Sequence, residues 1–390
     1  MPEHQPTQGL LFVTTIAGTS DSFLEETAQE AANQGFQVDL VTNMTGASLR
    51  DRPYRKICSV SWRRGFKLPT GTLKSISIIR RMMKSGEYSI IHTHTPTASA
   101  VTRMAAASLP RRRRPIIVYT AHGFHFGVGL ERFSNRVAEV VERTLLRWTD
   151  VLMVINDEDE IWAHREAPSG TKVLRTNGVG IGERFFTIQR TNQTRMQARG
   201  QLGLRLNNFV AVSIGELNPN KRHELAIAAM SELKGARTLL ILGEGPSHTE
   251  LLDQSSKVQS EYINFGIRLE GKQQDIVPYL QAADCLIHPA AREGQPLVIL
   301  EAMAAGLPVV AFRIRGCTDS LKDGRGFLAQ GSSASSLASE LEKIAAPDPD
   351  LSEIVQAARQ YSDKFSRESL ARETISLYIQ LANPGAELSS

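Results

Sequence analysis

The first half of the chain alternates short apolar runs with longer segments in which apolar residues recur at helical spacing. Short apolar runs are typical of buried strands, and strands separated by helices indicate βαβ units and a parallel sheet. The expected strands are Leu10–Val13, Val38–Val41, Ser89–His92, Ile116–Thr120, Val151–Ile155 and Lys172–Leu174. The expected helices are Ser22–Asn33, Thr72–Lys84, Thr97–Ala107, Arg132–Arg147 and Glu158–His164.

A second series of the same kind begins near Asn208. Its expected strands are Phe209–Ile214, Thr238–Leu242, Tyr262–Phe265, Asp284–Ile287 and Val309–Phe312. Its expected helices are Arg222–Ser231, Ser247–Ser260, Gln274–Gln281 and Leu297–Ala305. The two series predict an α/β protein with two doubly wound, Rossmann-like domains facing a central cleft, with ligands at the carboxyl ends of the strands.

The length of 390 residues exceeds one typical core and supports two domains. We expect a first domain over residues 1–188 and a second over residues 205–365. The stretch 189–204 between them is polar, as linkers are. Two further helices are expected at Leu351–Lys364 and Ser366–Leu381.

The composition, with 41% hydrophobic and 22% charged residues, is that of a soluble globular protein. No apolar run approaches the ~18 residues that a membrane-spanning helix needs, and the first residues lack the pattern of a signal peptide. The three cysteines lie far apart and without metal-type spacing. We therefore expect reduced thiols and a cytoplasmic location.

Positive charge is concentrated in the first half of the chain. The stretch Arg50–Lys84 contains eleven basic residues and one acidic residue, with Trp62 among them. This pattern favours an anionic partner, and we expect Arg63, Arg64 and Lys67 to contact lipid headgroups at the inner face of the plasma membrane. A solvated basic face is the alternative. Nucleic acid is not favoured, because no nucleic-acid-binding module accompanies the charge.

The stretch His288–Val310, HPAAREGQPLVILEAMAAGLPVV, carries the main candidate site. It passes from a predicted strand through a loop into a predicted helix, whose N-terminal N–H groups favour an anion such as a diphosphate. Two carboxylates, eight residues apart, can accept hydrogen bonds from ribose and sugar hydroxyls. The alternative is a solvated helix with ordinary surface acids. The candidate residues are Glu293, Gly294, Gln295, Pro296, Leu297 and Glu301.

In its strand–loop–helix setting, the pattern E-G-Q-P-L…E-A-M-A-A-G-L-P-V-V resembles the donor-site signature (E-x7-E) of retaining GT-B glycosyltransferases. The resemblance implies the GT-B fold and a nucleotide-diphosphate sugar donor held on the second domain. It also implies transfer with retention at the anomeric carbon. In that family the last helix packs back on the first domain, which implies the same for residues 366–382 here.

The segment Ser213–Lys221 resembles another element of the family, in which the lysine meets the donor diphosphate. This implies that role for Lys221, with Arg222 as a second cation. Glu216 stands where the family often has arginine, which puts the second cationic contact in doubt. Further residues near the donor are then expected at Gly18, Gly215, Gly245 and Arg268.

The string YTAHGFHF resembles bacterial capsule and exopolysaccharide glycosyltransferases, which act on lipid-linked acceptors. Within it, His122 matches the family histidine that faces the donor sugar. Gly180 stands where the family usually has aspartate, which suggests a changed detail at the domain junction. His92 and His94 could bind a metal, but no third ligand with suitable spacing is visible.

The resemblance therefore implies a retaining glycosyltransferase, with UDP as the expected nucleotide, acting in cell-surface polysaccharide biosynthesis. His122, Lys221 and Glu293 are the expected catalytic residues. No metal or other cofactor is expected, because no Asp-x-Asp cluster lies near the donor residues. A nucleotide-sugar epimerase of the same fold is one alternative, although it would lack E-x7-E. A catalytically inactive partner subunit is the other, although it would be expected to have lost one of the three residues.

Overall fold

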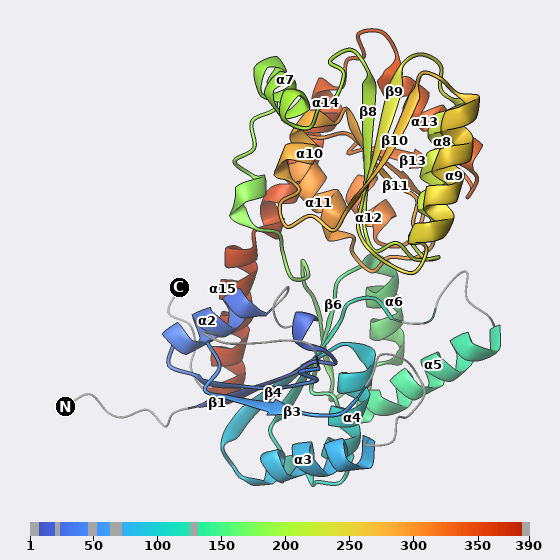
Figure 1. The fold of residues 1–390 in the computed structure, drawn as a ribbon. Coiled ribbons are helices and arrows are strands. Elements are labelled where there is room, and N and C mark those ends of the chain that lie inside the picture. The colour runs from blue at the N-terminus through green and yellow to red at the C-terminus, as the bar shows by residue number, and fades with distance from the viewer. Residues whose placement is uncertain are drawn as a thin grey trace. The chain divides into compact units, whose positions relative to one another are not determined.

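The computed structural model describes residues 8–19, 24–45, 53–62, 72–124, 126 and 132–383. The chain divides into two compact units, one formed by Met1–Gly180 with Arg367–Ser390 and the other by Ile181–Ser366. Each unit is built on one parallel sheet with helices on its faces (Figure 1). The final helix thus belongs to the first unit, as the resemblance implied.

The first unit has a seven-stranded parallel sheet in the order β3-β2-β1-β4-β5-β6-β7. Its strands are β1 (Gly9–Val13), β2 (Gln37–Thr42), β3 (Lys56–Ser59), β4 (Tyr88–His94), β5 (Ile116–Ala121), β6 (Val151–Val154) and β7 (Lys172–Arg175). Its helices are α2 (Glu25–Asn33), α3 (Thr72–Lys84), α4 (Pro96–Ala107), α5 (Arg132–Leu145), α6 (Asp157–Glu166) and α15 (Arg367–Ala382).

The second unit has a six-stranded parallel sheet in the order β10-β9-β8-β11-β12-β13. Its strands are β8 (Phe209–Ile214), β9 (Arg237–Leu242), β10 (Phe265–Gly271), β11 (Cys285–His288), β12 (Val309–Phe312) and β13 (Phe327–Ala329). Its helices are α7 (Asn192–Gln201), α8 (His223–Glu232), α9 (His248–Glu261), α10 (Val277–Ala282), α11 (Leu297–Ala304), α12 (Cys317–Leu321), α13 (Ala334–Ala345) and α14 (Ser352–Ser362).

Strand β1 is apolar throughout because helices cover both faces of the sheet. In β1, Leu10 and Phe12 point into the core that includes Tyr378 of α15. Leu11 and Val13 point into a second core with Ile79 of α3. This alternation follows from the two-residue repeat of a strand and explains why β1 shows no polar face.

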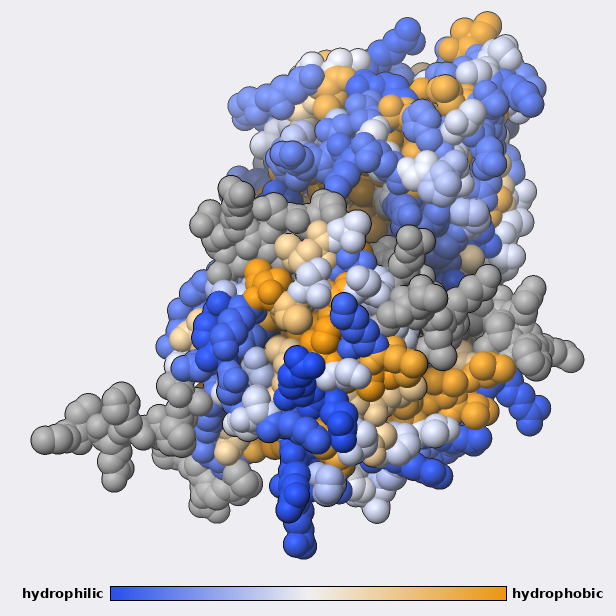
Figure 2. Space-filling model, turned by 60° about the horizontal axis from the view of Figure 1, so that its bottom comes forward, coloured by the Kyte–Doolittle hydropathy of each residue, from blue (hydrophilic) through white to orange (hydrophobic). Residues whose placement is uncertain are grey.

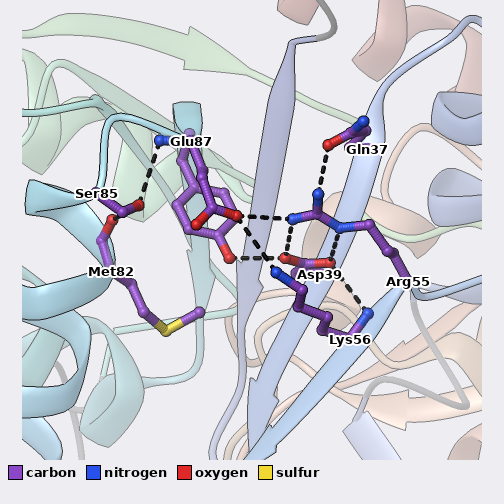
Figure 3. A network of polar contacts seen from close by, with 8 residues as sticks. Gln37, Asp39, Arg55, Lys56, Met82, Ser85 and Glu87 are labelled. Carbon is purple, nitrogen blue, oxygen red and sulfur yellow. Dashed lines mark hydrogen bonds and ion pairs between the residues drawn. The ribbon is translucent and has the colours of Figure 1, made fainter.

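The edge strand β3 was not expected from the sequence, since it is short and half-exposed. It is held by Asp39, a buried carboxylate on the neighbouring strand β2 (Figure 3). The guanidinium of Arg55 donates to both oxygens of Asp39, at 3.0 and 2.7 Å, and Tyr88 Oη donates at 2.6 Å. Burial alone raises the pKa of Asp39, but these donors lower it overall, so the carboxylate stays ionised.

The prediction of a strand at Tyr262–Phe265 is wrong in its position. The observed strand β10 begins at Phe265 and ends at Gly271. The side chains of Phe265, Ile267 and Leu269 alternate into the core, and this two-residue repeat continues through Gly266. A strand therefore passes through a glycine that sequence reasoning treated as a turn signal.

The stretch 189–204, expected to be a linker, instead carries α7 and belongs to the second unit. Thr191 begins α7 with a capping box, and Arg199 on α7 is buried, donating to Asp284 Oδ2 at 2.7 Å. The chain passes between the units at 180/181 and 366/367 instead. There the N–H of Ile181 donates to the carbonyl of Phe365 at 2.8 Å.

Candidate functional site

The strand order of the second sheet reverses between β8 and β11, which are neighbours at its centre. Ligands bind such open sheets outside the carboxyl ends of the strands at this switch point. Two loops leave the sheet there: residues 215–222 after β8 and residues 289–296 after β11. They contain most of the residues that the sequence predicted on the donor side.

Lys221 and Glu293, which are 72 positions apart in the sequence, form an ion pair across these loops, with Lys221 Nζ 2.5 Å from Glu293 Oε1. His288, at the end of β11, lies 3.0 Å from the same oxygen through Nε2. Their side chains are 22% exposed for Lys221, 14% for Glu293 and 2% for His288. The structure thus brings together two of the three expected catalytic residues and adds a third group, His288.

The charge on Glu293 is fixed by these partners. Burial alone raises the pKa of Glu293, but the hydrogen bond from His288 and the charge and hydrogen bond of Lys221 lower it to about 2. Burial lowers the pKa of His288, so His288 is neutral at neutral pH and donates from Nε2 to the carboxylate. Glu293 is therefore ionised and accepts hydrogen bonds from Lys221 and His288. Removing either donor would cost free energy.

The loop that carries Glu293 is held by the loop after β8. The carbonyl of Asn220 accepts from the N–H of Ala291 at 2.7 Å, and Asn220 Nδ2 donates to the carbonyl of Arg292 at 3.1 Å. Arg222 donates to the carbonyls of Pro289 and Ala290, both at 2.9 Å.

The guanidinium of Arg222 was expected to act as a second cation on the diphosphate. Its Nε and one of its terminal nitrogens are instead used on these loop carbonyls, and the group lies 4.8 Å from the ring centroid of Phe312. Arg222 itself has left-handed backbone angles, with φ 51°. In this structure its role is to fix the β11 loop, a role that the sequence did not reveal.

Three glycines allow the loops to approach one another. A Cβ on Gly243 would lie 1.9 Å from the carbonyl oxygen of Gly215, and one on Gly245 would lie 2.3 Å from that of Leu217. Gly316, with φ +77°, would meet the carbonyl oxygen of Gly294 at 2.5 Å. The first two contacts bring the loops after β8 and β9 together, and the third brings the segment after β12 against the loop of Glu293.

Helix α11 begins at Leu297, directly after Pro296, and no side chain caps its N-terminus. The N–H of Ile299 donates to the carbonyl of Pro296 at 3.0 Å, which leaves the N–H groups of Leu297 and Val298 as the ones that a ligand could bind at the end of the loop Gly294–Gln295. Glu301 lies within α11 and is partly buried. Lys221 reaches the loop that leads into this helix N-terminus through its ion pair with Glu293, and an anion between them stays a prediction.

One expected donor residue, Arg268, lies away from the strand end at which the sequence placed it. Arg268 is in the middle of β10, where it pairs with Glu270 at 2.5 Å and donates to the carbonyl of Leu202 at 2.6 Å. It was expected at a strand end because β10 was placed too early in the sequence. Gly18 is exposed just after β1 in the first unit. Arg63, Arg64 and Lys67 lie outside the described residues.

His122 follows β5 in the first unit, next to the end of β4. Its Nε2 lies 3.1 Å from Nδ1 of His94. Burial lowers the pKa of His122 to about 4 and that of His94 well below its usual value, so both rings are neutral at neutral pH. His92, on the same face of β4, bonds Tyr378 Oη through Nδ1 and Thr120 Oγ1 through Nε2.

Sequence reasoning missed His288, Asn220 and His94 as site residues. His288 ends an apolar strand, and no spacing rule links it to a residue five positions later. The pair H-T-H in β4 was visible, and its alternation placed both rings on one face. What the sequence could not show was the partner from the next strand.

Two parallel-sheet α/β units define the GT-B fold class, and solved structures bear this out over almost the whole chain. Sucrose-phosphate synthase from Thermosynechococcus elongatus matches 97% of this chain and 100% of its own, with a TM-score of 0.77 and 20% identity. HepE from Anabaena, solved in complex with UDP and glucose, matches 96% of this chain and 100% of its own, with a TM-score of 0.75 and 19% identity.

Comparison of the amino-acid sequence with known families identifies the family within the GT-B fold class. Residues 21–166 match the description "Glycosyltransferase Family 4" and residues 208–346 match "Glycosyl transferases group 1". EpsD of Bacillus subtilis, named as a glycosyltransferase, is 31% identical over 77% of this chain and 78% of its own. The chain belongs to the group 1 glycosyltransferases.

A further relative has a fully stated substrate. The UDP-Gal:alpha-D-GlcNAc-diphosphoundecaprenol alpha-1,3-galactosyltransferase of Escherichia coli is 29% identical over 63% of this chain and 62% of its own.

Among the described residues of the present chain, no helix is both long and apolar enough to span a membrane.

Proposed function

We propose that this glycosyltransferase transfers a sugar from a UDP-sugar to a lipid-linked saccharide, with retention at the anomeric carbon, in cell-surface polysaccharide biosynthesis. The observation that carries the proposal is the cluster of Lys221, Glu293 and His288 beside the N-terminus of α11. The named substrates of the Escherichia coli relative and the UDP complex of HepE support the donor and acceptor classes.

In this proposal the donor diphosphate lies against the N-terminus of α11 and Lys221. Lys221 exchanges Glu293 for a phosphate oxygen, and the freed oxygen of Glu293 accepts from a sugar hydroxyl. Glu301 accepts from the ribose, and the N–H groups around Gly294 and Leu297 orient the sugar. The negative charge that grows on the departing phosphate is then stabilised by Lys221 and the helix N-terminus.

Transfer on the same face of the sugar follows if the departing phosphate takes the proton of the attacking acceptor hydroxyl. The bond from the anomeric carbon to the phosphate oxygen breaks, the bond to the acceptor oxygen forms, and UDP leaves with the proton. His122 is the contribution of the first unit, contacting the donor sugar as a neutral ring. Charge neutralisation by Lys221 and α11 leaves no step that requires a metal ion.

The test is a transfer assay with a panel of UDP-sugars and a saccharide on a lipid diphosphate. We expect a glycosylated lipid and UDP in equal amounts, with activity that survives exhaustive chelation. Interconversion of the nucleotide sugar without an acceptor would instead indicate an epimerase. Absence of any product with all donors would indicate an inactive subunit, and strict dependence on Mg²⁺ or Mn²⁺ would contradict metal independence.

We further propose that the first unit docks on an anionic membrane surface. Helix α5 exposes three valines at helical spacing: Val137 is 46% exposed, Val140 44% and Val141 39%. Figure 2 shows hydrophobic residues at the surface of this unit next to strongly hydrophilic ones. Such a combination suits an interface, where charges meet headgroups and apolar groups lie below them. Among the residues of α3 and α5 whose side chains the structure describes, the exposed basic ones are Lys74, Arg81, Lys84, Arg136 and Arg143.

A further inference from the structure

His94 is a buried histidine that the proposed transfer does not use. It ends β4, is 3% exposed, and its Nδ1 lies 3.1 Å from Nε2 of His122. The two ring centroids are 5.3 Å apart and the ring planes differ by 21°. Because the centroids are farther apart than the nitrogens by about two ring radii, the rings meet edge to edge, as a linear N–H···N bond requires.

The ring of His94 is itself held in place. His92 packs against it with centroids 4.0 Å apart, and both nitrogens of His92 are used by Tyr378 and Thr120. Thr120 lies on β5, the strand that leads to His122, and Tyr378 lies on α15. The position of His94 is therefore set by three elements of the unit.

The other nitrogen of His94 faces a small cavity. Within the described part of the chain, Nε2 of His94 has no hydrogen-bond partner, although it is buried. The cavity has a volume of about 30 Å³, and four threonines line it with His94: Thr27, Thr120, Thr176 and Thr374. This is enough room for an ordered water, which can satisfy Nε2 in either protonation state.

We propose that His94 is a positioning residue for His122. The bond between Nδ1 of His94 and Nε2 of His122 holds the His122 ring and couples the tautomer of His122 to that of His94. With Nε2 turned inward, the Nδ1 edge of His122 is the one that meets the donor sugar. The proposal rests on the proposed function only in that last step, since the bond itself exists without a ligand.

A neutral imidazole carries one proton, so the two rings must have complementary tautomers. If Nδ1 of His94 is protonated, then Nε2 of His122 is unprotonated and Nδ1 of His122 is protonated. If Nδ1 of His94 is unprotonated, then Nε2 of His122 is protonated and Nδ1 of His122 is an acceptor. Either pair gives one proton between the rings, and any other pair gives two or none.

Nitrogen NMR of histidine-labelled protein at neutral pH tests the bond directly. Resonances of His94 and His122 are assigned from the variants that lack each ring. We expect one protonated and one bare nitrogen at the shared position. Protons on both nitrogens, or on neither, would overturn the proposal. This readout needs no substrate, so it decides the pairing even if the protein transfers no sugar and the proposed function fails.

Two variants test the consequence for transfer. Leucine in H94L is of similar size but cannot hydrogen-bond, and we expect kcat to fall about 10- to 100-fold, with the donor KM changed much less, since a slightly misplaced catalytic group acts mainly on turnover. The amide of H94N can reach the position of Nδ1, so we expect it to recover most of that loss.

The matched control is T93V, at the buried position next to His94 on the opposite face of β4. We expect it to keep the wild-type kcat. If folded H94L keeps the wild-type kcat, or if H94N loses as much as H94L, then His94 does not position His122. Should H94L fail to fold, the NMR measurement on the wild-type protein and the H94N comparison still decide.

Discussion

Glu293 has two donors on one carboxylate oxygen, and they differ in how readily each can be given up. Lys221 is on a flexible side chain that is 22% exposed, whereas His288 is 2% exposed at the end of a strand. A buried carboxylate left without a partner costs several kcal/mol. We infer that His288 keeps its hydrogen bond to Glu293 while Lys221 moves to the diphosphate. The carboxylate then always has at least one hydrogen-bond donor.

Replacing Lys221 by alanine should therefore lower turnover more than it lowers stability. The expected loss of transition-state stabilisation is about 2–4 kcal/mol, the scale of one preorganised charge-stabilising group. Steady-state kinetics with the preferred UDP-sugar measures it. Lys234→Ala, which removes an exposed lysine of the same unit, should have no effect. A folded Lys221→Ala variant with wild-type turnover would remove Lys221 from the mechanism.

At the residue scale, the sequence predicted the two charged residues that the structure pairs, Lys221 and Glu293. It did so through the resemblance of both motifs to a glycosyltransferase donor site, and the structure adds that the motifs follow the neighbouring strands β8 and β11. It could not predict that Arg222 binds loop carbonyls, since an arginine and a lysine side by side look equally suited to a phosphate. Nor could it show that Arg268 lies in the middle of a strand.

At the element scale, the close approach of three strand ends depends on glycine at fixed positions. The Cβ of an alanine at 243 would overlap the carbonyl oxygen of Gly215, and Gly243 has φ +149°. The oxygen belongs to the backbone and the position of the Cβ is set by the backbone at 243, so neither atom can move aside without shifting a loop of the site.

Gly243→Ala should therefore destabilise the second unit by about 1–3 kcal/mol and weaken donor binding. Gly200→Ala is the matched control: Gly200 lies in helix α7 with open space around its Cβ position. It should raise stability slightly, by about 0.5 kcal/mol. Denaturant unfolding measures both. A Gly243→Ala protein as stable as wild type would show that the loops have room to separate.

The elements with strong periodicity were predicted well. Helix α3 has the expected bounds, Thr72–Lys84, and strand β8 has the expected bounds, Phe209–Ile214. Short or polar elements were not: β13 has three residues, and α7 has a polar sequence whose helix depends on the capping box at Thr191 and on burial of Arg199. Tertiary contacts, which the local sequence does not encode, decide such elements.

At the scale of the whole molecule, the chain combines a donor-type site in one unit with a basic, partly apolar surface on the other. Each basic residue near an anionic membrane contributes on the order of 1 kcal/mol. We therefore expect sedimentation with anionic liposomes that weakens as salt is added. Binding should fall when Arg63, Arg64 and Lys67 become glutamine, and when Val140 and Val141 become serine.

Neutral liposomes are the control for this experiment, and the exposed residue Ile263 of the second unit offers a matched substitution, Ile263→Ser, that should not change binding. Equal binding to neutral and anionic vesicles, or binding to neither, would contradict an anionic membrane surface as the partner. Loss of binding in the arginine variant alone would limit the contact to the basic residues.

The central claim is retaining transfer from a UDP-sugar, and the anomeric configuration of the product tests it most directly. An α-linked UDP-sugar that serves as donor in the transfer assay is used, and the glycosylated lipid is analysed by proton NMR as it forms. The account predicts an α-linked product whose formation is lost in Glu293→Gln. A β-linked product from the wild-type protein would contradict it.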